Sequence, residues 1–271
     1  MSGGDTWGEF LHGPACGHAV QIYADVSELA QSVAAYVAAG FASGEPAVLL
    51  ATPDTLAAFA EALAELGWDT AQLDDEGLLV TADAAATLRA IMGVTGIPSA
   101  GLFEAVVGGL LDGAAERFPG KRVRAFGELV DLLSGRGQAD AALAVEERWN
   151  ELGRSRRFLS LLCGYRLDVF DRGVQAGLLV DICRTHTHVL PAADPARLER
   201  AVHAALEEVL GRDSAGKVYV LVGREIRESR VPAAQLVLMW VSENVPALAE
   251  RILAAAREGY AAVPAPDSAP S

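Results

Sequence analysis

Short apolar runs alternate with longer alanine-rich stretches from Gly17 to about Leu190. The runs predict strands at residues 20–23, 46–52, 78–81, 122–129 and 158–165. Apolar residues at helical spacing predict the intervening helices, at residues 26–39, 54–66, 99–118 and 139–152. Because the strands are apolar on both faces and helices separate them, the pattern predicts a mostly parallel sheet with helices on both sides, a three-layer α/β/α sandwich.

The pattern changes after Pro191 and predicts a small C-terminal α/β appendage. Its expected elements are a helix at 195–210, a polar break at 211–216, a strand at 218–222 and helices at 233–242 and 247–260. The last eleven residues contain three prolines and few large apolar side chains, so a disordered tail is expected. The predicted domains are an N-terminal extension at 1–16, the sandwich at 17–192, the appendage at 193–260 and the tail at 261–271.

The two C-terminal helices are strongly apolar for their length. Residues 235–241 are nearly all apolar, and the helix at 247–260 has one apolar face. Two short helices cannot bury both surfaces against each other alone. We therefore expect them to cover the sandwich or to meet a second copy of the chain, and intramolecular packing and a homodimer stay open as alternatives.

Charge and cysteine content narrow the function classes. The formal net charge is −14 and no Lys or Arg precedes Arg89, so binding to nucleic acid or to an anionic membrane surface is not expected. The longest uncharged run, 29–44, is shorter than the ~18 apolar residues that a membrane span needs. The first residues lack the basic start of a secretory signal, and three cysteines cannot all pair within one chain. These features favour a cytoplasmic location.

Six segments carry a resemblance to a known family. They are 18–23 (HAVQIY), 44–50 (GEPAVLL), 122–128 (RVRAFGE), 146–150 (EERWN), 160–165 (SLLCGY) and 183–191 (CRTHTHVLP). Over about residues 17–192 the chain resembles the MEDS domain, the sensory domain of methanogen and methylotroph regulators of the DcmR type. The resemblance implies a degenerate RecA/KaiC-like fold and a role in sensing small carbon compounds.

The phosphate-binding loop of a RecA-like ATPase has no counterpart after the first predicted strand. Such a loop supplies glycines, a lysine and a Ser or Thr, whereas residues 22–29 (IYADVSEL) contain no glycine, no lysine and two acids. We therefore expect no ATP hydrolysis there. The string GRDSAGKV at 211–218 has nearly the P-loop spacing, but it follows a predicted helix and precedes a predicted strand, so we interpret it as a solvated turn.

The candidate ligand-binding residues come from three sources. Ligands of open parallel sheets bind beyond the carboxyl ends of the strands, which selects Tyr23, Asp25, Glu128 and Tyr165, with Cys163 beside them. The helix at 139–152 presents a polar pair and an aromatic ring on neighbouring positions, and further residues come from the segments that carry the resemblance. The predicted ligand-binding set is His18, Tyr23, Asp25, Glu45, Arg124, Glu128, Glu146, Trp149, Asn150 and Tyr165.

Two of these residues have structural alternatives. Glu128 could instead form an ion pair with Arg122 or Arg124, since a carboxylate in an apolar strand needs a partner. Trp149 could be a core residue, because buried indoles are common without a ligand. We predict a pocket at the carboxyl edge of the sheet, with Tyr23, Glu128, Trp149 and Asn150 among its walls.

Histidines and cysteines suggest a metal-binding alternative. His186 and His188 alternate on a predicted strand with Cys183 before them, and a second group, His12, Cys16 and His18, lies near the N-terminus. If the last strand returned beside the first, these groups could form a mixed nitrogen and sulfur site. The paired spacing of a zinc ribbon is absent, so we predict hydrogen-bonded histidines and no cofactor, with Cys183, His186 and His188 as the alternative metal ligands.

The favoured hypothesis is a sensory or signalling module without ATPase activity that binds a small organic ligand or a regulatory protein partner. A non-standard nucleotide-binding protein or enzyme and a metal-binding protein are the alternatives. No catalytic residue is predicted, because nothing places a nucleophile in a G-x-S-x-G elbow; the question of an enzyme stays open, and a non-catalytic role is favoured. Since no output region is recognised, the signal is expected to pass through a partner or through self-association.

Overall fold

The computed structural model describes residues 10, 17–190, 194–228 and 231–262. The chain divides into two compact units. The first unit comprises residues 1–166 and 185–188, and the second comprises residues 167–184 and 189–271. The predicted N-terminal extension lies outside the described residues except for Phe10, and of the predicted tail only 261–262 are described, where they end the last helix rather than being disordered.

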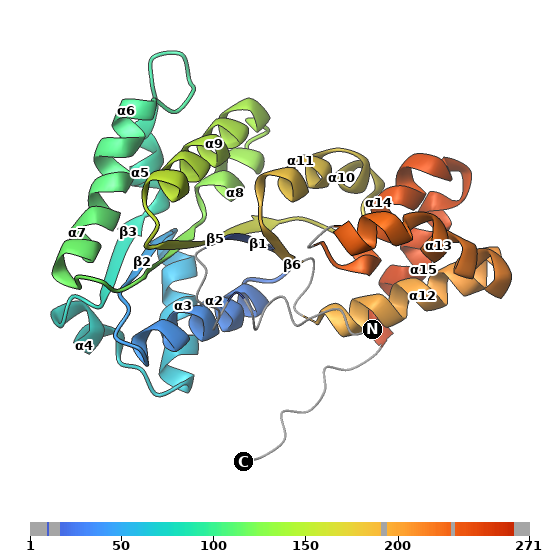
Figure 1. Ribbon diagram of the computed structural model, residues 1–271, viewed down its shortest axis with the longest axis horizontal. Coiled ribbons are helices and arrows are strands. Elements are labelled where there is room, and N and C mark those ends of the chain that lie inside the picture. The colour runs from blue at the N-terminus through green and yellow to red at the C-terminus, as the bar shows by residue number, and fades with distance from the viewer. Residues whose placement is uncertain (1–9, 11–16, 191–193, 229–230, 263–271) are drawn as a thin grey trace. The chain divides into compact units, whose positions relative to one another are not determined.

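The first unit is built on a parallel sheet, as the alternation of strands and helices predicted (Figure 1). The strands are β1 (His18–Tyr23), β2 (Ala47–Ala51), β3 (Leu79–Asp83), β4 (Val123–Gly127), β5 (Leu159–Arg166) and β6 (His188–Leu190). Their order in the sheet is β3-β2-β4-β5-β1-β6. The pairings of β1 with β5, β2 with β3 and β4, and β4 with β5 are all parallel.

Helices cover both faces of this sheet, which confirms the α/β/α sandwich (Figure 1). One layer contains α2 (Val26–Phe41) and α3 (Pro53–Glu65), and the opposite layer contains α5 (Ala84–Ile91), α7 (Gly109–Arg117) and α9 (Ala139–Ser155). Strands β1, β2 and β4 are buried along their whole length, because both of their faces pack against helices. Shorter helices complete the unit, namely α4 (Thr70–Asp75), α6 (Ala100–Phe103) and α8 (Leu129–Ser134).

Two parts of the sandwich differ from the sequence prediction. No helix was expected between the third strand and residue 99, yet α5 follows β3 directly, with the Asp83 carboxylate accepting a hydrogen bond from the Ala86 amide. The helix expected at 99–118 consists of α6, a π-helical turn at Glu104–Gly108 and α7. Capping by a single aspartate and a π-helical turn are local features that apolar periodicity does not record.

The register of β1 and β5 decides which side chains share a face. Paired residues on parallel strands point to the same side, and the pairs include His18 with Leu161, Val20 with Cys163 and Ile22 with Tyr165. The Tyr165 hydroxyl donates to Glu146 of α9, so this set faces the α9 layer. The alternate residues face α2, where Tyr36 donates a hydrogen bond to the Ser160 carbonyl.

Apart from the end of β6, the described secondary structure of the second unit consists of helices joined by short loops. Its helices are α10 (Arg172–Ala176), most of α11 (Leu178–Thr185), α12 (Pro195–Leu210), α13 (Arg212–Glu228), α14 (Ala233–Asn244) and α15 (Pro246–Ala262). The predicted strand at 218–222 is therefore wrong, because these residues lie inside α13. Ala215, Val218 and Val222 are buried at helical spacing while Val220 is exposed, so helical packing overrides the β-branched run.

The apolar C-terminal helices pack within the second unit. α15 contacts α12 and α14, and α14 contacts α13. The apolar face expected on the last helix is buried through Ala249, Ile252, Leu253 and Ala256. α12 and α13 therefore supply surface that α14 and α15 bury within the second unit, and the homodimer stays a prediction.

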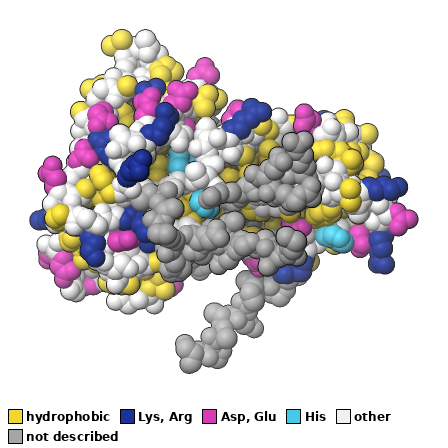
Figure 2. Space-filling model, in the orientation of Figure 1, with side chains coloured by type: hydrophobic (Ala, Val, Ile, Leu, Met, Phe, Trp, Pro, Cys, Tyr) yellow, Lys and Arg dark blue, Asp and Glu magenta, His cyan; other side chains and the backbone are white. Residues whose placement is uncertain are grey.

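Two further features concern the apolar character of the helices and the charges on the surface. Among the described residues, no helix combines the length and the apolar character that crossing a membrane requires. On the face shown in Figure 2, Lys and Arg side chains are interspersed with Asp and Glu side chains.

Candidate functional site

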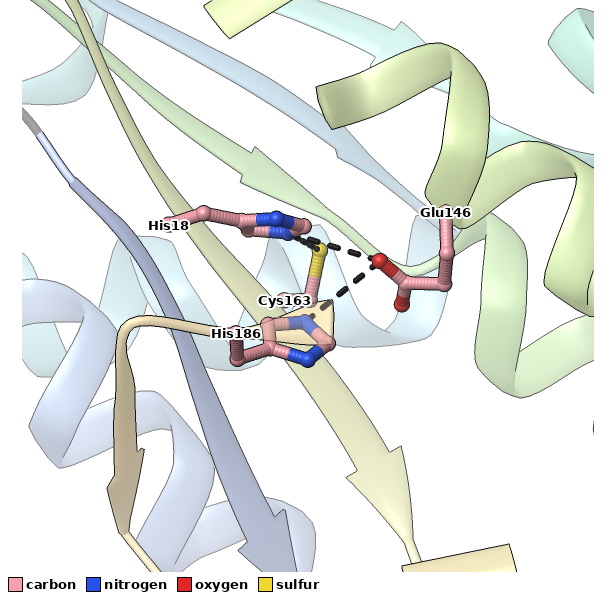
Figure 3. Close-up of side chains that lie close together, drawn as sticks. All are labelled: His18, Glu146, Cys163 and His186. Atoms are coloured by element: carbon pink, nitrogen blue, oxygen red, sulfur yellow. Dashed lines mark hydrogen bonds and ion pairs between the residues drawn. The ribbon is translucent and has the colours of Figure 1, made fainter. Parts of the chain in front are cut away.

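Four buried side chains meet in the first unit between the sheet and α9 (Figure 3). His18 Nε2 lies 3.2 Å from Cys163 Sγ and 3.5 Å from Glu146 Oε2. His186 Nε2 lies 3.4 Å from the same Glu146 oxygen. The rings of His18 and His186 are tilted by 49° with their centroids 4.1 Å apart. We call these four residues the His–Cys–Glu cluster.

The order of the strands brings the cluster together. β1 lies between β5 and β6 in the sheet, so His18 at the start of β1 has Cys163 of β5 on one side and the segment before β6 on the other. The amide of Thr187 donates to the His18 carbonyl at 2.7 Å, which fixes the neighbouring His186. Glu146 reaches the same point from α9, where it lies on the buried face of the helix.

Hydrogen bonds to the atoms that point away from the centre of the cluster orient its side chains. His18 Nδ1 lies 3.2 Å from Asn150 Oδ1, and the Tyr165 hydroxyl donates to Glu146 Oε1 at 2.7 Å. His186 Nδ1 lies 3.0 Å from the Thr185 hydroxyl. Asn150 also donates from its side-chain amide to the Thr185 carbonyl at 3.3 Å. Each imidazole therefore directs its Nε2 atom toward the centre of the cluster.

Burial decides the protonation of the cluster. Burial, and then the neighbouring His186 ring, lower the pKa of His18 from 6.5 to about 3. Burial raises the pKa of Glu146 against the opposing influence of His18 and of the hydrogen bond from Tyr165. Burial, and then the Glu146 carboxylate, raise the pKa of Cys163 well above that of a free thiol. At neutral pH the protein thus presents a neutral His18 and a protonated Cys163.

A pocket of about 200 Å³ adjoins the cluster. It opens beside the first residues of β1 and β5 and the C-terminal half of α9, and His18 belongs both to its wall and to the cluster. The wall combines polar groups with apolar ones. Its lining includes Gly17, His18, Trp149, Asn150, Gly153 and Thr187.

The structure separates residues that the sequence placed in one pocket. Trp149 and Asn150 line the pocket at the amino ends of the strands. Tyr23 ends β1 and donates to Asp131 at 3.0 Å, and Glu128 directly follows β4. These residues therefore lie at the opposite edge of the sheet. The four residues expected to line one pocket are thus divided between the two edges of the sheet, because α9 runs back from the carboxyl edge toward the start of β5.

Other predicted site residues make structural contacts. Glu128 accepts hydrogen bonds from the Thr52 amide at 2.6 Å and from the Thr55 hydroxyl at 2.8 Å, so the alternative of an ion pair with Arg122 or Arg124 is wrong. Arg124 instead donates to Glu45 at 2.7 Å and to the Tyr36 carbonyl.

Two more of the predicted residues have structural roles in the first unit. The Asp25 carboxylate caps α2 by accepting from the Ser27 amide at 2.7 Å. Trp149 is 1% exposed and packs edge-on against Phe103, as the core alternative predicted, while also lining the pocket.

The structure groups the histidines and cysteines differently from the metal-binding alternative that the sequence suggested. Of Cys183, His186 and His188, only His186 belongs to the cluster. His188 Nδ1 lies 3.0 Å from the Thr187 hydroxyl and its ring contacts Phe10, and Cys183 lies in the second unit. His12 and Cys16 fall outside the described residues. The sequence points to Cys163 and Glu146 separately. Only the placement of β5 and α9 beside the histidines links these two residues to them.

Comparisons with known proteins give one match. A family model described as MEDS, the methanogen/methylotroph DcmR sensory domain, matches residues 17–187. No curated protein matches the chain. The matched segment includes the whole His–Cys–Glu cluster and every residue named above in the lining of the pocket.

Proposed function

Since the chain belongs to the MEDS family of sensory domains, we propose that residues 17–187 sense a small organic molecule that binds in the pocket beside His18. The observation that carries the proposal is the pocket itself. It lies within the family domain, and three residues of the predicted ligand-binding set, His18, Trp149 and Asn150, line it.

The size and lining of the pocket indicate the chemistry of the ligand. A volume of about 200 Å³ is below the ~300–1,000 Å³ of pockets that hold drug-sized ligands, so we expect a small ligand. Leu159, Leu161 and Trp149 offer apolar surface, while Asn150 and Thr187 offer hydrogen-bonding groups. We therefore expect a short apolar body that carries one polar group.

The position of the pocket supports a sensory role. Thr187 hydrogen-bonds both the amide and the carbonyl of His18 through its hydroxyl, at 3.0 and 2.9 Å, so the segment before β6 depends on contacts at the pocket wall. A ligand that engages Asn150 or Thr187 stabilises one arrangement of that segment over others. The resulting signal then passes to a regulatory partner or to a second copy of the chain.

The proposed module works without ATP hydrolysis. The N-terminus of α2, where a phosphate loop would bind nucleotide, is capped by the Asp25 carboxylate, and no glycine or lysine stands between Ile22 and Leu29. At the same edge of the sheet the Glu128 and Asp131 carboxyls add negative potential and bond to the protein's own donors. This supports a RecA/KaiC-like sandwich that has lost nucleotide chemistry.

The proposal is tested by filling the pocket. Gly153 lines the pocket and a Cβ there meets nothing within 4 Å, so Gly153→Leu is expected to narrow the pocket. The matched control is Gly113→Leu, at an exposed helical position that is equally open. Native mass spectrometry of the purified chain identifies co-purified small molecules, and short-chain alcohols, amines, carboxylic acids and amides are then screened by thermal shift and calorimetry.

The expected result is that a bound compound raises the melting temperature of the wild type and of Gly113→Leu but not of Gly153→Leu. If Gly153→Leu binds the compound as tightly as the wild type does, the pocket is not the ligand site. If none of the compounds binds and nothing co-purifies, the proposal of a small organic ligand is wrong and the regulatory protein partner becomes the remaining candidate.

A further inference from the structure

We propose that the His–Cys–Glu cluster binds one Zn²⁺ ion through His18 Nε2, Glu146 Oε2, Cys163 Sγ and His186 Nε2. These four atoms all lie within 4.8 Å of one another and all four residues are buried. Imidazole nitrogen, thiolate sulfur and carboxylate oxygen are the ligands that Zn²⁺ takes in proteins, most often four in a tetrahedron. The proposal does not depend on the organic ligand proposed for the neighbouring pocket.

The spacing of the atoms fits a tetrahedral ion. Zinc bonds of about 2.0–2.3 Å place neighbouring ligand atoms of a tetrahedron roughly 3.3–3.6 Å apart. The measured separations are 3.2 Å from His18 Nε2 to Cys163 Sγ, 3.5 Å from His18 Nε2 to Glu146 Oε2 and 3.4 Å from His186 Nε2 to Glu146 Oε2. The other three pairs lie within 4.8 Å, and ion binding is expected to draw them closer together. Four protein ligands fill the coordination sphere, as in structural zinc sites.

The groups around the cluster match the outer contacts of a zinc site. Zinc-binding histidines hydrogen-bond an oxygen through their second nitrogen, and ligating carboxylates are themselves hydrogen-bonded. Here His18 Nδ1 meets Asn150 Oδ1, His186 Nδ1 meets the Thr185 hydroxyl, and Glu146 Oε1 accepts from Tyr165. Glu146 Oε2, which faces the histidines in Figure 3, has no hydrogen-bond partner in the described part of the chain.

Charge balance also favours a divalent cation. Binding forms a Zn–S bond and breaks the S–H bond of Cys163, whose proton passes to solvent. The thiolate and the Glu146 carboxylate then carry two negative charges, which neutralise Zn²⁺ inside the protein. A buried carboxylate without such a partner is costly, and Glu146 is only 2% exposed.

The test uses the full chain, stripped of metal by a chelator and titrated with Co²⁺ and then with Zn²⁺. Co²⁺ is a spectroscopic substitute for Zn²⁺ in such sites. The expected result is one Co²⁺ per chain, with the absorption of a tetrahedral ion and a thiolate-to-cobalt charge-transfer band, and complete displacement by one equivalent of Zn²⁺. If the wild type shows no charge-transfer band, the proposal is wrong.

Matched variants assign the ligands. Cys163→Ser is expected to lose the charge-transfer band, whereas Cys183→Ser, which changes the other described cysteine, keeps it. Asn150→Ala removes an outer contact and is expected to weaken Zn²⁺ binding by about 10–100-fold while keeping the band. Survival of the band in Cys163→Ser, or its loss in a folded Cys183→Ser, contradicts the assignment.

Two further measurements keep the zinc proposal testable if Cys163→Ser does not fold, and keep its test separate from that of the pocket proposal. If circular dichroism shows that Cys163→Ser does not fold, the wild-type spectrum together with Asn150→Ala decides the outcome, because unchanged affinity in Asn150→Ala contradicts the site. Gly153→Leu fills the pocket but leaves all four ligand atoms in place. It is expected to bind Zn²⁺ like the wild type, so failure of the pocket proposal and failure of the zinc proposal give different results.

Discussion

Gly40 of α2 and Arg124 of β4 lie in direct contact, with no room for a side chain between them. A Cβ at position 40 would stand 2.6 Å from Arg124 Cδ and 2.7 Å from its Nε. Arg124 cannot move away easily, because it donates to Glu45 and to the Tyr36 carbonyl and stacks over the Tyr36 ring. The glycine is therefore required by packing, although its position is helical.

Gly40→Ala is expected to destabilise the protein by about 1–3 kcal/mol through this overpacking. Gly113→Ala is the control, since a Cβ there meets nothing within 4 Å, and it is expected to stabilise the protein by about 0.5–1 kcal/mol, as alanine usually does in helices. Urea unfolding monitored by circular dichroism measures both. Changes of the same sign in the two variants would contradict the packing argument.

The buried pair of Arg124 and Glu45 is expected to matter more than a surface pair. Arg124 is 3% exposed, so Arg124→Met leaves the Tyr36 carbonyl without this donor and Glu45, among the described residues, with only Arg122, 3.4 Å away; the expected cost is about 1–3 kcal/mol. Arg148→Met, which breaks the more exposed pair with Glu151, should cost about 0–1 kcal/mol. Equal losses of unfolding free energy in the two variants would count against a special role for the buried pair.

Glu128 gives the folded protein a pH dependence of known sign. Burial raises the pKa of Glu128, so the folded state holds this proton more tightly than the unfolded state does. The stabilisation is full below the unfolded pKa of about 4.5 and is lost as pH rises through the folded pKa. Glu128→Gln removes the titration; its one side-chain oxygen can still accept from the Thr52 amide, and its amide nitrogen can donate to the Thr55 hydroxyl.

We therefore expect the unfolding free energy of Glu128→Gln, relative to wild type, to increase as pH is raised from 4.5 to 7.5. Urea titrations at both pH values give this difference, with Glu65→Gln at an exposed position of α3 as the reference variant. A relative stability of Glu128→Gln that stays constant or decreases over this interval refutes the prediction.

The second unit contains a buried amide pair. Gln235 and Gln175 are both fully buried, and Gln235 Nε2 donates to Gln175 Oε1 at 2.7 Å. Gln235→Leu leaves that oxygen buried without its donor, at an expected cost of about 1–3 kcal/mol. The double variant with Gln175→Leu is expected to cost less than the sum of the single variants, as denaturant unfolding can measure; additive costs would show that the pair is not coupled.

ATP hydrolysis by the purified chain is expected to stay at the buffer background. The Asp25 cap on α2 and the carboxyls at the same sheet edge leave no donor set for a triphosphate. Phosphate release is measured for the wild type and for Glu128→Gln. Hydrolysis that is present in the wild type and lost in Glu128→Gln would overturn the expectation, whereas equal rates identify a contaminating enzyme.

Apolar periodicity alone determined most of the sandwich. The strands around Val20, Val48, Ala125 and Leu161 were predictable because each is a short apolar run between turns and helices, and burial on both faces leaves such a run without polar positions. By the same criterion the apolar run at 218–222 predicts a strand, and that prediction is wrong. It is β-branched, but only its neighbours at helical spacing show that α13 buries one face.

Residue type, together with the family resemblance, also identified most of the chemistry-bearing side chains, including His18, Glu146 and His186, but not their grouping. Only the tertiary structure decided that β6 lies next to β1 and that α9 runs back to the start of β5. Those two facts join His18 to His186 and place Trp149 and Asn150 at the amino edge of the sheet. The sequence determines local structure through short-range periodicity, whereas contacts between residues far apart in the chain depend on strand order and helix direction, which periodicity does not encode.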